Sequence, residues 1–360
     1  MTKKLLNRRT FIASSAGATL AMPFLSRTAF SQSAYAGKDY LVTLPDTTNE
    51  KLVIEHVAPL MKERFGVNLK TQSSASGKTL STMRVQRRNP PALVATLDMS
   101  YALQAHEEGL IDDVTEELVP NLADVRPQAR IQDGKIVSFI ISIDTLVYNK
   151  NRWSTPITSY ADIFAPDMIA TSAIASPSTQ NGLEFIAGAA AVATGKPISE
   201  AMYNLEAGIE YLGQFRDKIG VVFGRAQEVM PMLASGEINS CFVKARFLAE
   251  WLALDAPVGA VIPKEGAFYS LNCLVPVKGT NATEVAMGYI DIMLSPEIQA
   301  LFPSAIGSAA VNTKAVADVP EKLKTIVPSV EDIEKLSLLP ILDQAKMESL
   351  NTLFNHVVGK

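Results

Sequence analysis

Residues 136–148 read IVSFIISIDTLVY, a long apolar stretch that is interrupted only by small polar residues and by Asp144. A second long apolar stretch, Ser270 to Val277, comes later. Shorter apolar runs and helical patterns lie between the two. We therefore expect two lobes joined by two long strands, with lobe 1 built from residues 37–144 and 270–360 and lobe 2 from residues 145–269.

Short apolar runs alternate with helical patterns in both lobes. In lobe 1 the runs at 40–44, 67–71 and 93–97 predict strands, each followed by a helix. These strands are continuously apolar, which is typical of a parallel sheet covered by helices on both faces. The order predicts an α/β fold with two doubly wound lobes and a two-strand hinge. In lobe 2 we expect strands at 169–175, 220–223, 238–243 and 258–262, and helices at 183–193, 200–215, 227–234 and 246–254. We expect the tail from residue 319 onward to pack over lobe 1.

The first 36 residues have the layout of a bacterial export signal. Arg8 and Arg9 precede a weakly apolar run at 11–25, and Ala34-Tyr35-Ala36 is a small-x-small cleavage signal. The paired arginines resemble the twin-arginine (Tat) class, with the general export route as the alternative. The run is too short and too rich in small polar residues to span a bilayer. We expect a periplasmic protein whose signal is cleaved near Ala36.

The charge of the remaining chain excludes several classes of partner. Removing residues 1–36 takes away five of the 33 basic side chains and none of the 37 acidic ones, which leaves 28 against 37 and a net charge near −9. Such a protein is a poor candidate for binding nucleic acid or an anionic membrane surface. The remaining chain of about 320 residues is longer than one compact core usually holds, so we expect two lobes. We expect a monomer.

Motifs for catalysis fail on inspection. Gly77-Lys78-Thr79 looks like the end of a phosphate-binding loop, but the glycine required five residues earlier is Gln72. The Ser-x-x-Lys arrangement of penicillin-binding enzymes would need a serine at Ala75. The sequence therefore predicts no enzyme and no cofactor, with an exported enzyme of unrecognised site as the alternative.

The histidines and cysteines do not suggest a metal site. His56, His106 and His356 are far apart in the sequence, and no cysteine pair has zinc-binding spacing. Cys241 and Cys273 lie within separate apolar runs. We expect two buried thiols, because a free cysteine packs as a small hydrophobe, although the periplasm would permit one disulfide.

Small polar residues recur between a predicted strand and the next helix. Such turns leave backbone N–H groups unpaired at the positive end of the helix dipole, and in an open α/β sheet they lie where ligands bind. Ordinary helix capping uses the same residues. Because such turns recur on two lobes, we predict a cleft that binds a small ligand. The turns are Asp46-Thr47-Thr48-Asn49, Ser73-Ser74-Ala75-Ser76-Gly77, Asp98-Met99-Ser100, residues 176–182 and Gly224-Arg225.

Two basic residues sharpen this prediction. Lys244 and Arg246 directly follow the predicted strand at 238–243, so their side chains can reach the same sheet edge. Together with helix N-termini they would suit an anion such as a carboxylate, phosphate or phosphonate.

Several stretches resemble the solute-binding proteins of bacterial ABC importers, in particular the branch with the spermidine/putrescine and iron(III) binding proteins. The most specific are residues 262–266 (IPKEG), the strand at 271–276 and residues 295–299 (SPEIQ); residues 144–150, 107–111 and 235–238 support them. The resemblance implies a type II periplasmic binding fold whose lobes close on a small-molecule solute. It also implies delivery to an inner-membrane ABC permease without chemistry; service to a sensor is an alternative.

Departures from that family bear on the ligand. Asn272 stands where polyamine-binding relatives have an acid, Ser270 replaces a tryptophan, and Gly182 replaces the acid of the lobe 2 helix. Lys244 puts a positive charge where a polyamine would lie. The adjacent tyrosine pair expected of iron(III) binders is also missing. We therefore expect a small anionic or zwitterionic organic solute, with a polyamine as the alternative.

The expected ligand-binding residues follow from these positions. Asp46, Asp98 or Asp144 would hold the ammonium group of a zwitterion. Lobe 1 would contribute Asp46, Thr47, Ser73, Ser74, Ser76, Asp98 and Ser100, with Asp144 where the chain crosses between the lobes. Lobe 2 would contribute Thr179, Gln180, Asn181, Lys244 and Arg246, with Tyr269 and Asn272 near the hinge.

Overall fold

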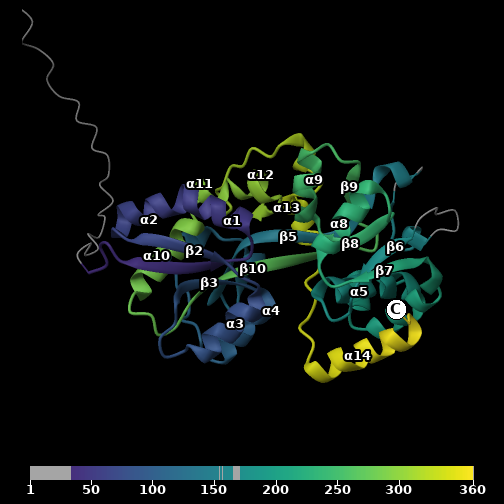
Figure 1. Cartoon of the computed structure of the whole chain (residues 1–360), viewed down its shortest axis with the longest axis horizontal. Helices are drawn as coiled ribbons and strands as arrows, with labels where there is room; N and C mark the ends of the chain where they lie inside the picture. Colours follow the sequence, from purple (N-terminus) through teal and green to yellow (C-terminus); the bar gives the residue numbers. More distant parts are fainter. Residues whose placement is uncertain (1–33, 154, 156, 165–170, 360) are drawn as a thin grey trace, which may run out of the picture.

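The computed structural model describes residues 34–153, 155, 157–164 and 171–359. Residues 1–33 of the predicted export signal, and the first two residues of the strand predicted at 169–175, lie outside these ranges. The molecule is elongated, and two long strands, β5 (Ile136–Asn149) and β10 (Phe268–Pro276), run along its middle (Figure 1). They are the two strands expected from the long apolar stretches.

The main sheet has the strand order β11-β5-β10-β3-β1-β2. β1 is parallel to both β2 and β3, whereas β10 is antiparallel to β3 and to β5. A short strand, β4, pairs with the beginning of β5. The bounds of the remaining strands of this part are β1 (Asp39–Leu44), β2 (Asn68–Ser73), β3 (Ala92–Asp98), β4 (Arg130–Ile131) and β11 (Ala309–Ala310).

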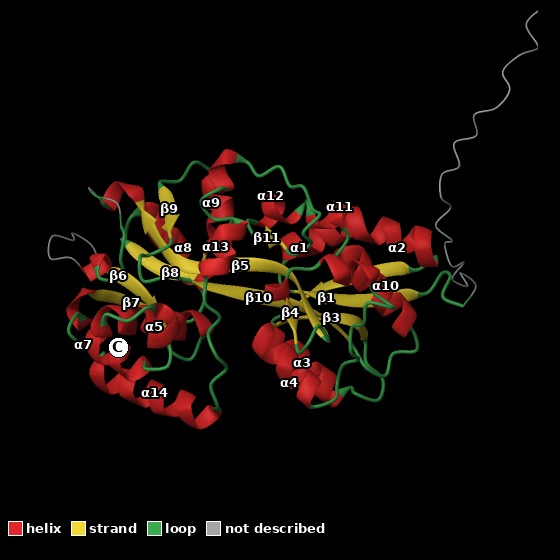
Figure 2. Ribbon diagram, turned by 180° about the vertical axis from the view of Figure 1, so that it is seen from behind, coloured by secondary structure: helices red, strands yellow, loops and turns green. Residues whose placement is uncertain are grey.

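Helices cover both faces of this sheet, with α3 and α4 on one side and α1, α2 and α11 on the other (Figures 1 and 2). The side chain of Asp46 accepts a hydrogen bond from the backbone N–H of Asn49 and so caps α1, as its residue type favours. The α-helices are α1 (Thr47–Leu52), α2 (Ala58–Phe65), α3 (Ser76–Val85), α4 (Met99–Glu107), α10 (Thr283–Met293), α11 (Pro296–Gln299) and α12 (Phe302–Ile306). A π-helical turn, η1 (Val53–Val57), joins α1 to α2, and η2 (Pro120–Asp124) and η3 (Pro127–Ala129) are 3₁₀ turns.

The second half of β5 organises the other part of the molecule. β8 (Ser240–Lys244) and β9 (Val258–Val261) both pair with it antiparallel, and β6 (Ser172–Ala175) pairs parallel with β7 (Ile219–Phe223). The α-helices here are α5 (Gln180–Thr194), α6 (Ile198–Ala201), α7 (Leu205–Gly213), α8 (Ala226–Ser235) and α9 (Ala249–Ala253). The 3₁₀ turns are η4 (Lys150–Arg152), η5 (Asp162–Phe164), η6 (Arg216–Lys218) and η7 (Ala245–Leu248).

The apolar core changes where β5 and β10 pass from one part to the other, at residues 142–144 and 268–270, which we call the crossing. Before it, Ile141 and Leu271 belong to a first core packed around the main sheet. Beyond it, Leu146 and Val147 point to opposite faces of β5 and enter two further clusters, together the second core. The α/β fold with two long crossing strands is confirmed. We propose that the boundary between the lobes lies at the crossing.

The end of the chain departs from the prediction. The tail contains η8 (Glu321–Leu323), α13 (Val330–Lys335) and α14 (Gln344–Val357). Leu350 and Phe354 of α14 are buried in the second core. The α14 helix packs against α7 (Figure 2). The expectation that the tail packs over lobe 1 is therefore wrong for this helix, because its apolar side complements the outer face of lobe 2. The tail reaches lobe 2 beside β10, where the Tyr269 N–H donates to the Ser337 carbonyl at 3.0 Å.

Two sequence features have plain structural outcomes. Among the helices that the structure describes, none combines the length and hydrophobicity needed to cross a membrane. Cys241 and Cys273 are buried free thiols, Cys241 in the second core and Cys273 in the first.

Candidate ligand-binding site

Charged side chains from three strand ends meet at the crossing. Asp98 ends β3, Lys244 ends β8, and Asp46 follows β1 by two residues. The strand pairing fixes their neighbours, since Asp98 lies opposite Asn272 on β10 and Asp144 lies opposite Lys244. The ends of strands from both cores thus bring together the acids and bases that the sequence placed there.

Asp98 is the centre of the first group of contacts. One carboxylate oxygen accepts from Asn272 Nδ2 at 2.9 Å and from Lys244 Nζ at 3.4 Å, and the other accepts from Ser76 Oγ at 2.9 Å. Burial alone would raise the pKa of Asp98, but the charge of Lys244 and the hydroxyl of Ser76 hold that pKa below its usual value. Asp98 is therefore ionised at neutral pH.

Asp46 and Arg246 form a second contact between the two parts. Asp46 Oδ2 accepts from Arg246 Nη1 at 2.8 Å, while Oδ1 caps α1 through the Asn49 backbone N–H at 2.9 Å. The Arg246 side chain is 11% exposed, and its guanidinium carbon lies 4.9 Å from the Phe247 ring centroid. Burial would raise the pKa of Asp46, yet the net effect of Arg246 and the capping bonds is to lower it. Two ion pairs therefore join elements on opposite sides of the crossing.

A pair of buried carboxyl groups lies beside Lys244. Asp144 and Glu184 are both fully buried. Glu184, the fifth residue of α5, accepts from Gln180 Nε2 at 2.7 Å and from Asn181 Nδ2 at 3.3 Å. Neither oxygen of Asp144 accepts a hydrogen bond of normal geometry from the described residues. Burial raises the pKa of both groups, and the charge of Asp144 raises that of Glu184 further.

Glu184 is a further candidate site residue that the sequence interpretation does not include. Gly182 stands where the resemblance places an acid in relatives, and a Cβ at 182 would lie 2.0 Å from the Ser176 carbonyl oxygen. The glycine thus permits the tight turn into α5, and Glu184 follows two residues later. The spacing of Gln180, Asn181 and Glu184 on one face of an otherwise apolar helix could have indicated this.

The residues predicted from the sequence for the ligand site divide into two sets. Those brought together around the crossing are Asp46, Ser76, Asp98, Asp144, Gln180, Asn181, Lys244, Arg246 and Asn272. Others have local roles: Ser73 Oγ donates to Glu50 at 2.8 Å, Ser74 Oγ accepts from Thr79 at 2.9 Å, and Thr179 caps α5. Thr47 is exposed at the start of α1, Ser100 is half-buried in α4, and Tyr269 packs against both cores.

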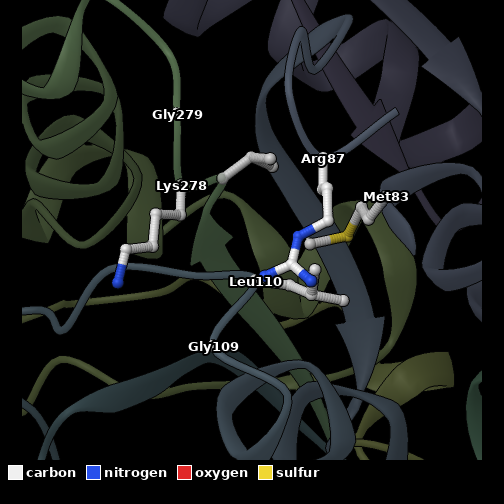
Figure 3. Close-up of a pocket in the computed structure, with 7 residues that line it drawn as sticks. Met83, Arg87, Gly109, Leu110, Lys278 and Gly279 are labelled. Carbon is white, nitrogen blue, oxygen red and sulfur yellow. The ribbon is translucent and has the colours of Figure 1, made fainter. Parts of the chain in front are cut away.

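A surface pocket of ≈ 270 Å³ lies elsewhere (Figure 3). Met83, Arg87, Leu110 and Lys278 are among its lining residues. It sits at the other end of β3 from Asp98, next to the C-terminal end of β10, because the Val277 N–H donates to the Leu93 carbonyl there. No residue predicted for the ligand site lines it. In the part of the chain that the structure describes, no group of three or more histidine, cysteine or acidic residues is placed to hold a metal ion.

The site at the crossing combines buried charges of both signs, which suits the binding of a charged solute without suggesting a reaction. Solved structures with the same fold include three with informative names. The spermidine/putrescine ABC transporter substrate-binding protein of Streptococcus pneumoniae is 15% identical with a TM-score of 0.75, covering 89% of this chain and 98% of that one. The periplasmic binding protein AfuA of Actinobacillus pleuropneumoniae, with fructose-6-phosphate bound, is 18% identical with a TM-score of 0.67 over 89% and 99%. A protein described as the Atu4243–GABA receptor is 18% identical with a TM-score of 0.70 over 88% and 96%.

These likenesses confirm the type II periplasmic binding fold that the sequence resemblance implied. No curated protein matches the chain in sequence. Residues 55–327, however, match the family described as bacterial extracellular solute-binding proteins. This match covers most of the chain and both sides of the crossing, and it confirms the prediction of a binding protein in place of an enzyme. The chain belongs to the family of bacterial extracellular solute-binding proteins.

Proposed function

We propose that this protein is the periplasmic solute-binding component of an ABC importer, and that it captures a small zwitterionic organic solute at the crossing. One observation carries the proposal: Lys244 and Arg246 are almost buried beside the fully buried pair Asp144 and Glu184. Buried charges are costly unless they find partners. A solute with an ammonium group at one end and a carboxylate at the other offers a partner to both.

The balance of charges narrows the ligand from the anionic or zwitterionic class expected from sequence. Four carboxyl groups and two cations surround the crossing, and Asp46 and Asp98 already pair with Arg246 and Lys244. A purely anionic solute would have to compete with both carboxylates. A polyamine would meet Lys244 and Arg246 as like charges, at a cost in this poorly hydrated place.

A polyamine remains a second candidate because carboxyl groups outnumber cations at the site. One protein of this fold is named for spermidine and putrescine, another is bound to a sugar phosphate, and a third is named for GABA. The fold therefore accommodates solutes of each charge type. The choice among them depends on the side chains of this chain.

The wider biology proposed here follows the family. The N-terminal 36 residues would act as a twin-arginine export signal cleaved near Ala36, which gives a periplasmic monomer. Its two lobes would close on the solute by a hinge motion at the crossing, and the closed form would dock on an inner-membrane permease. Association with a sensor would use the same binding step.

The test is a set of matched solutes. 4-Aminobutyrate, succinate and putrescine share a four-carbon chain and differ in the charges at their ends. We expect 4-aminobutyrate to raise the melting temperature of the mature protein, since a ligand at about 100 times its Kd stabilises by about 2.7 kcal/mol. If putrescine alone stabilised the protein, the proposed solute would be a polyamine and not a zwitterion. No response to these or to a wider panel of amino acids, sugar phosphates and organic acids would refute solute capture.

A further inference from the structure

The carboxyl pair of Asp144 and Glu184 is short of partners. Within the described ranges, neither oxygen of Asp144 makes a hydrogen bond of normal geometry, and neither does the buried hydroxyl of the nearby Ser270. Glu184 accepts hydrogen bonds from the side-chain amides of Gln180 and Asn181, which are neutral donors. Lys244, the nearest cation, directs its ammonium to Asp98. Ser270 and Glu184 lie near enough to Asp144 to act on its pKa, but neither makes a hydrogen bond of normal geometry to it, so a stronger donor would satisfy this buried acceptor better.

Asp144 and Glu184 are fully buried and close enough to act on each other's pKa, and two such carboxyl groups do not both carry a negative charge at neutral pH. Such pairs hold a proton between them and titrate together. The proton can be replaced by another cation that offers N–H donors, provided that it fits between the acids. A primary ammonium group carries three such donors and one positive charge.

We propose that Asp144 and Glu184 form an ammonium-binding subsite that holds one proton while empty and releases that proton when the amine of the solute enters. In the empty site one carboxyl is protonated and the other ionised. The incoming ammonium brings one positive charge, both carboxyls become ionised, and the displaced proton leaves to solvent. The exchange balances charge and makes or breaks no covalent bond. It rests on the proposed function, because it assigns one end of the proposed zwitterion to a place.

The other charged groups that face the pair keep their protonation states across the neutral range. On β8 and η7, Lys244 stays charged because the nearby acids raise its pKa despite burial, and Arg246 is a permanent cation. On β3, Asp98 stays ionised because Lys244 lowers its pKa. Tyr160, which packs nearby and hydrogen-bonds the Gly266 carbonyl, stays neutral because burial and Glu184 raise its pKa. The carboxyl pair is thus the group at this site free to exchange a proton.

The first measurement needs no ligand. Infrared spectra of the mature protein at neutral pH should contain the carbonyl band of a protonated carboxyl group, and that band should be missing from Glu184→Gln. Asp217→Asn is the matched control, because the Asp217 side chain is 99% exposed and should leave the band unchanged. A band that persists in Glu184→Gln, or is absent from the wild type, would overturn the shared proton.

The second measurement counts protons during binding. Calorimetric titration with 4-aminobutyrate in phosphate and in Tris at the same pH should report release of close to one proton per solute bound. Glu184→Gln should abolish this release and weaken binding about tenfold to a hundredfold, as expected for a lost charged hydrogen bond. Circular dichroism of the variant would establish that it folds. Asp217→Asn should bind and release protons as the wild type does.

The outcomes separate this inference from the proposed function. Binding of 4-aminobutyrate without proton release would overturn the proton exchange and leave solute capture intact. Stabilisation by succinate, with no response to either amine, would overturn the ammonium subsite and likewise leave solute capture intact. A failure of every solute in the wider panel would refute both.

Discussion

Replacing Lys244 with methionine would remove the cation that several carboxyl groups share. Its Nζ lies 3.4 Å from Asp98 Oδ1, and its charge also acts on the buried Asp144 and Glu184. Methionine keeps an unbranched, flexible side chain of similar length, so the packing around the stem changes little. The variant therefore isolates the effect of the charge.

The size of the effect follows from the surroundings of each acid. Removing one member of a fully buried ion pair costs about 3–5 kcal/mol. Asp98, however, has a side chain that is 36% exposed, and it keeps the hydrogen bonds from Ser76 and Asn272. Asp144 can take up a proton when its nearest cation is lost, which limits its penalty. We expect Lys244→Met to lower the free energy of unfolding by about 2 kcal/mol at pH 7, between the values for a buried and an exposed pair.

The difference from the wild type should depend on pH at both ends. The folded-state pKa of Lys244 is raised, so its stabilising contribution is complete below the unfolded value of about 10.4 and is lost as the pH rises through the folded pKa. The folded-state pKa of Asp98 is lowered, so its contribution is present above about 3.9 and is lost as the pH falls through the folded pKa. The gap between the two proteins should be widest near neutral pH.

Urea unfolding, followed by the fluorescence of Trp153 and Trp251, would measure this gap at several pH values. Lys264→Met serves as control, because Lys264 is exposed and should change stability little. Equal stability of Lys244→Met and wild type at pH 7, or a gap that does not narrow at acid and alkaline pH, would refute the placement of Lys244 among these carboxylates.

Three further substitutions test other parts of the structure, each by thermal unfolding. Gly182→Ala should destabilise by about 3 kcal/mol because its Cβ would lie 2.0 Å from a backbone oxygen, whereas Gly224→Ala, with open space at that position, should be close to neutral. Asn272→Asp should replace a donor 2.9 Å from Asp98 with a like charge and cost about 2 kcal/mol at pH 8, and less at pH 4 where the new acid is protonated. Phe354→Ala should lower the free energy of unfolding by about 3–5 kcal/mol, because this side chain is 1% exposed in the second core. A loss below about 0.5 kcal/mol, as is typical of a surface residue, would contradict the packing of α14 against the second core.

Much of this fold could be predicted from the sequence because strand and helix periods are local signals. The apolar runs at 40–44, 93–97 and 258–262 each fall within one residue of an observed strand. The two long apolar stretches identified β5 and β10, and with them the crossing, because few strands in a sheet are so long. Asp98 and Lys244 could be assigned to the site from their places at strand ends, since such ends gather at one edge of an open sheet.

The rest depends on tertiary contacts that no local pattern encodes. Nothing in the sequence indicates that Lys244 and Arg246 pair with Asp98 and Asp46 across the crossing, because the partners are about 150 to 200 residues apart. The α14 helix has an apolar side that fits either lobe in principle. Glu184 could not be identified from the sequence because the resemblance places the acid of this helix at position 182, where the turn leaves no room for a side chain.

These pairings also explain why the ammonium end of a solute should matter more than its carboxylate. A solute carboxylate that reaches Lys244 or Arg246 must displace Asp98 or Asp46, so one carboxylate contact replaces another and the net gain is small. An ammonium that reaches Asp144 displaces only the shared proton and offers hydrogen bonds to oxygens that make none of normal geometry with the described residues. The gain in free energy is therefore larger at the carboxyl pair. Selectivity between a zwitterion and a simple anion should then arise at Asp144 and Glu184, while the two cations align the other end of the solute and reject a second positive charge.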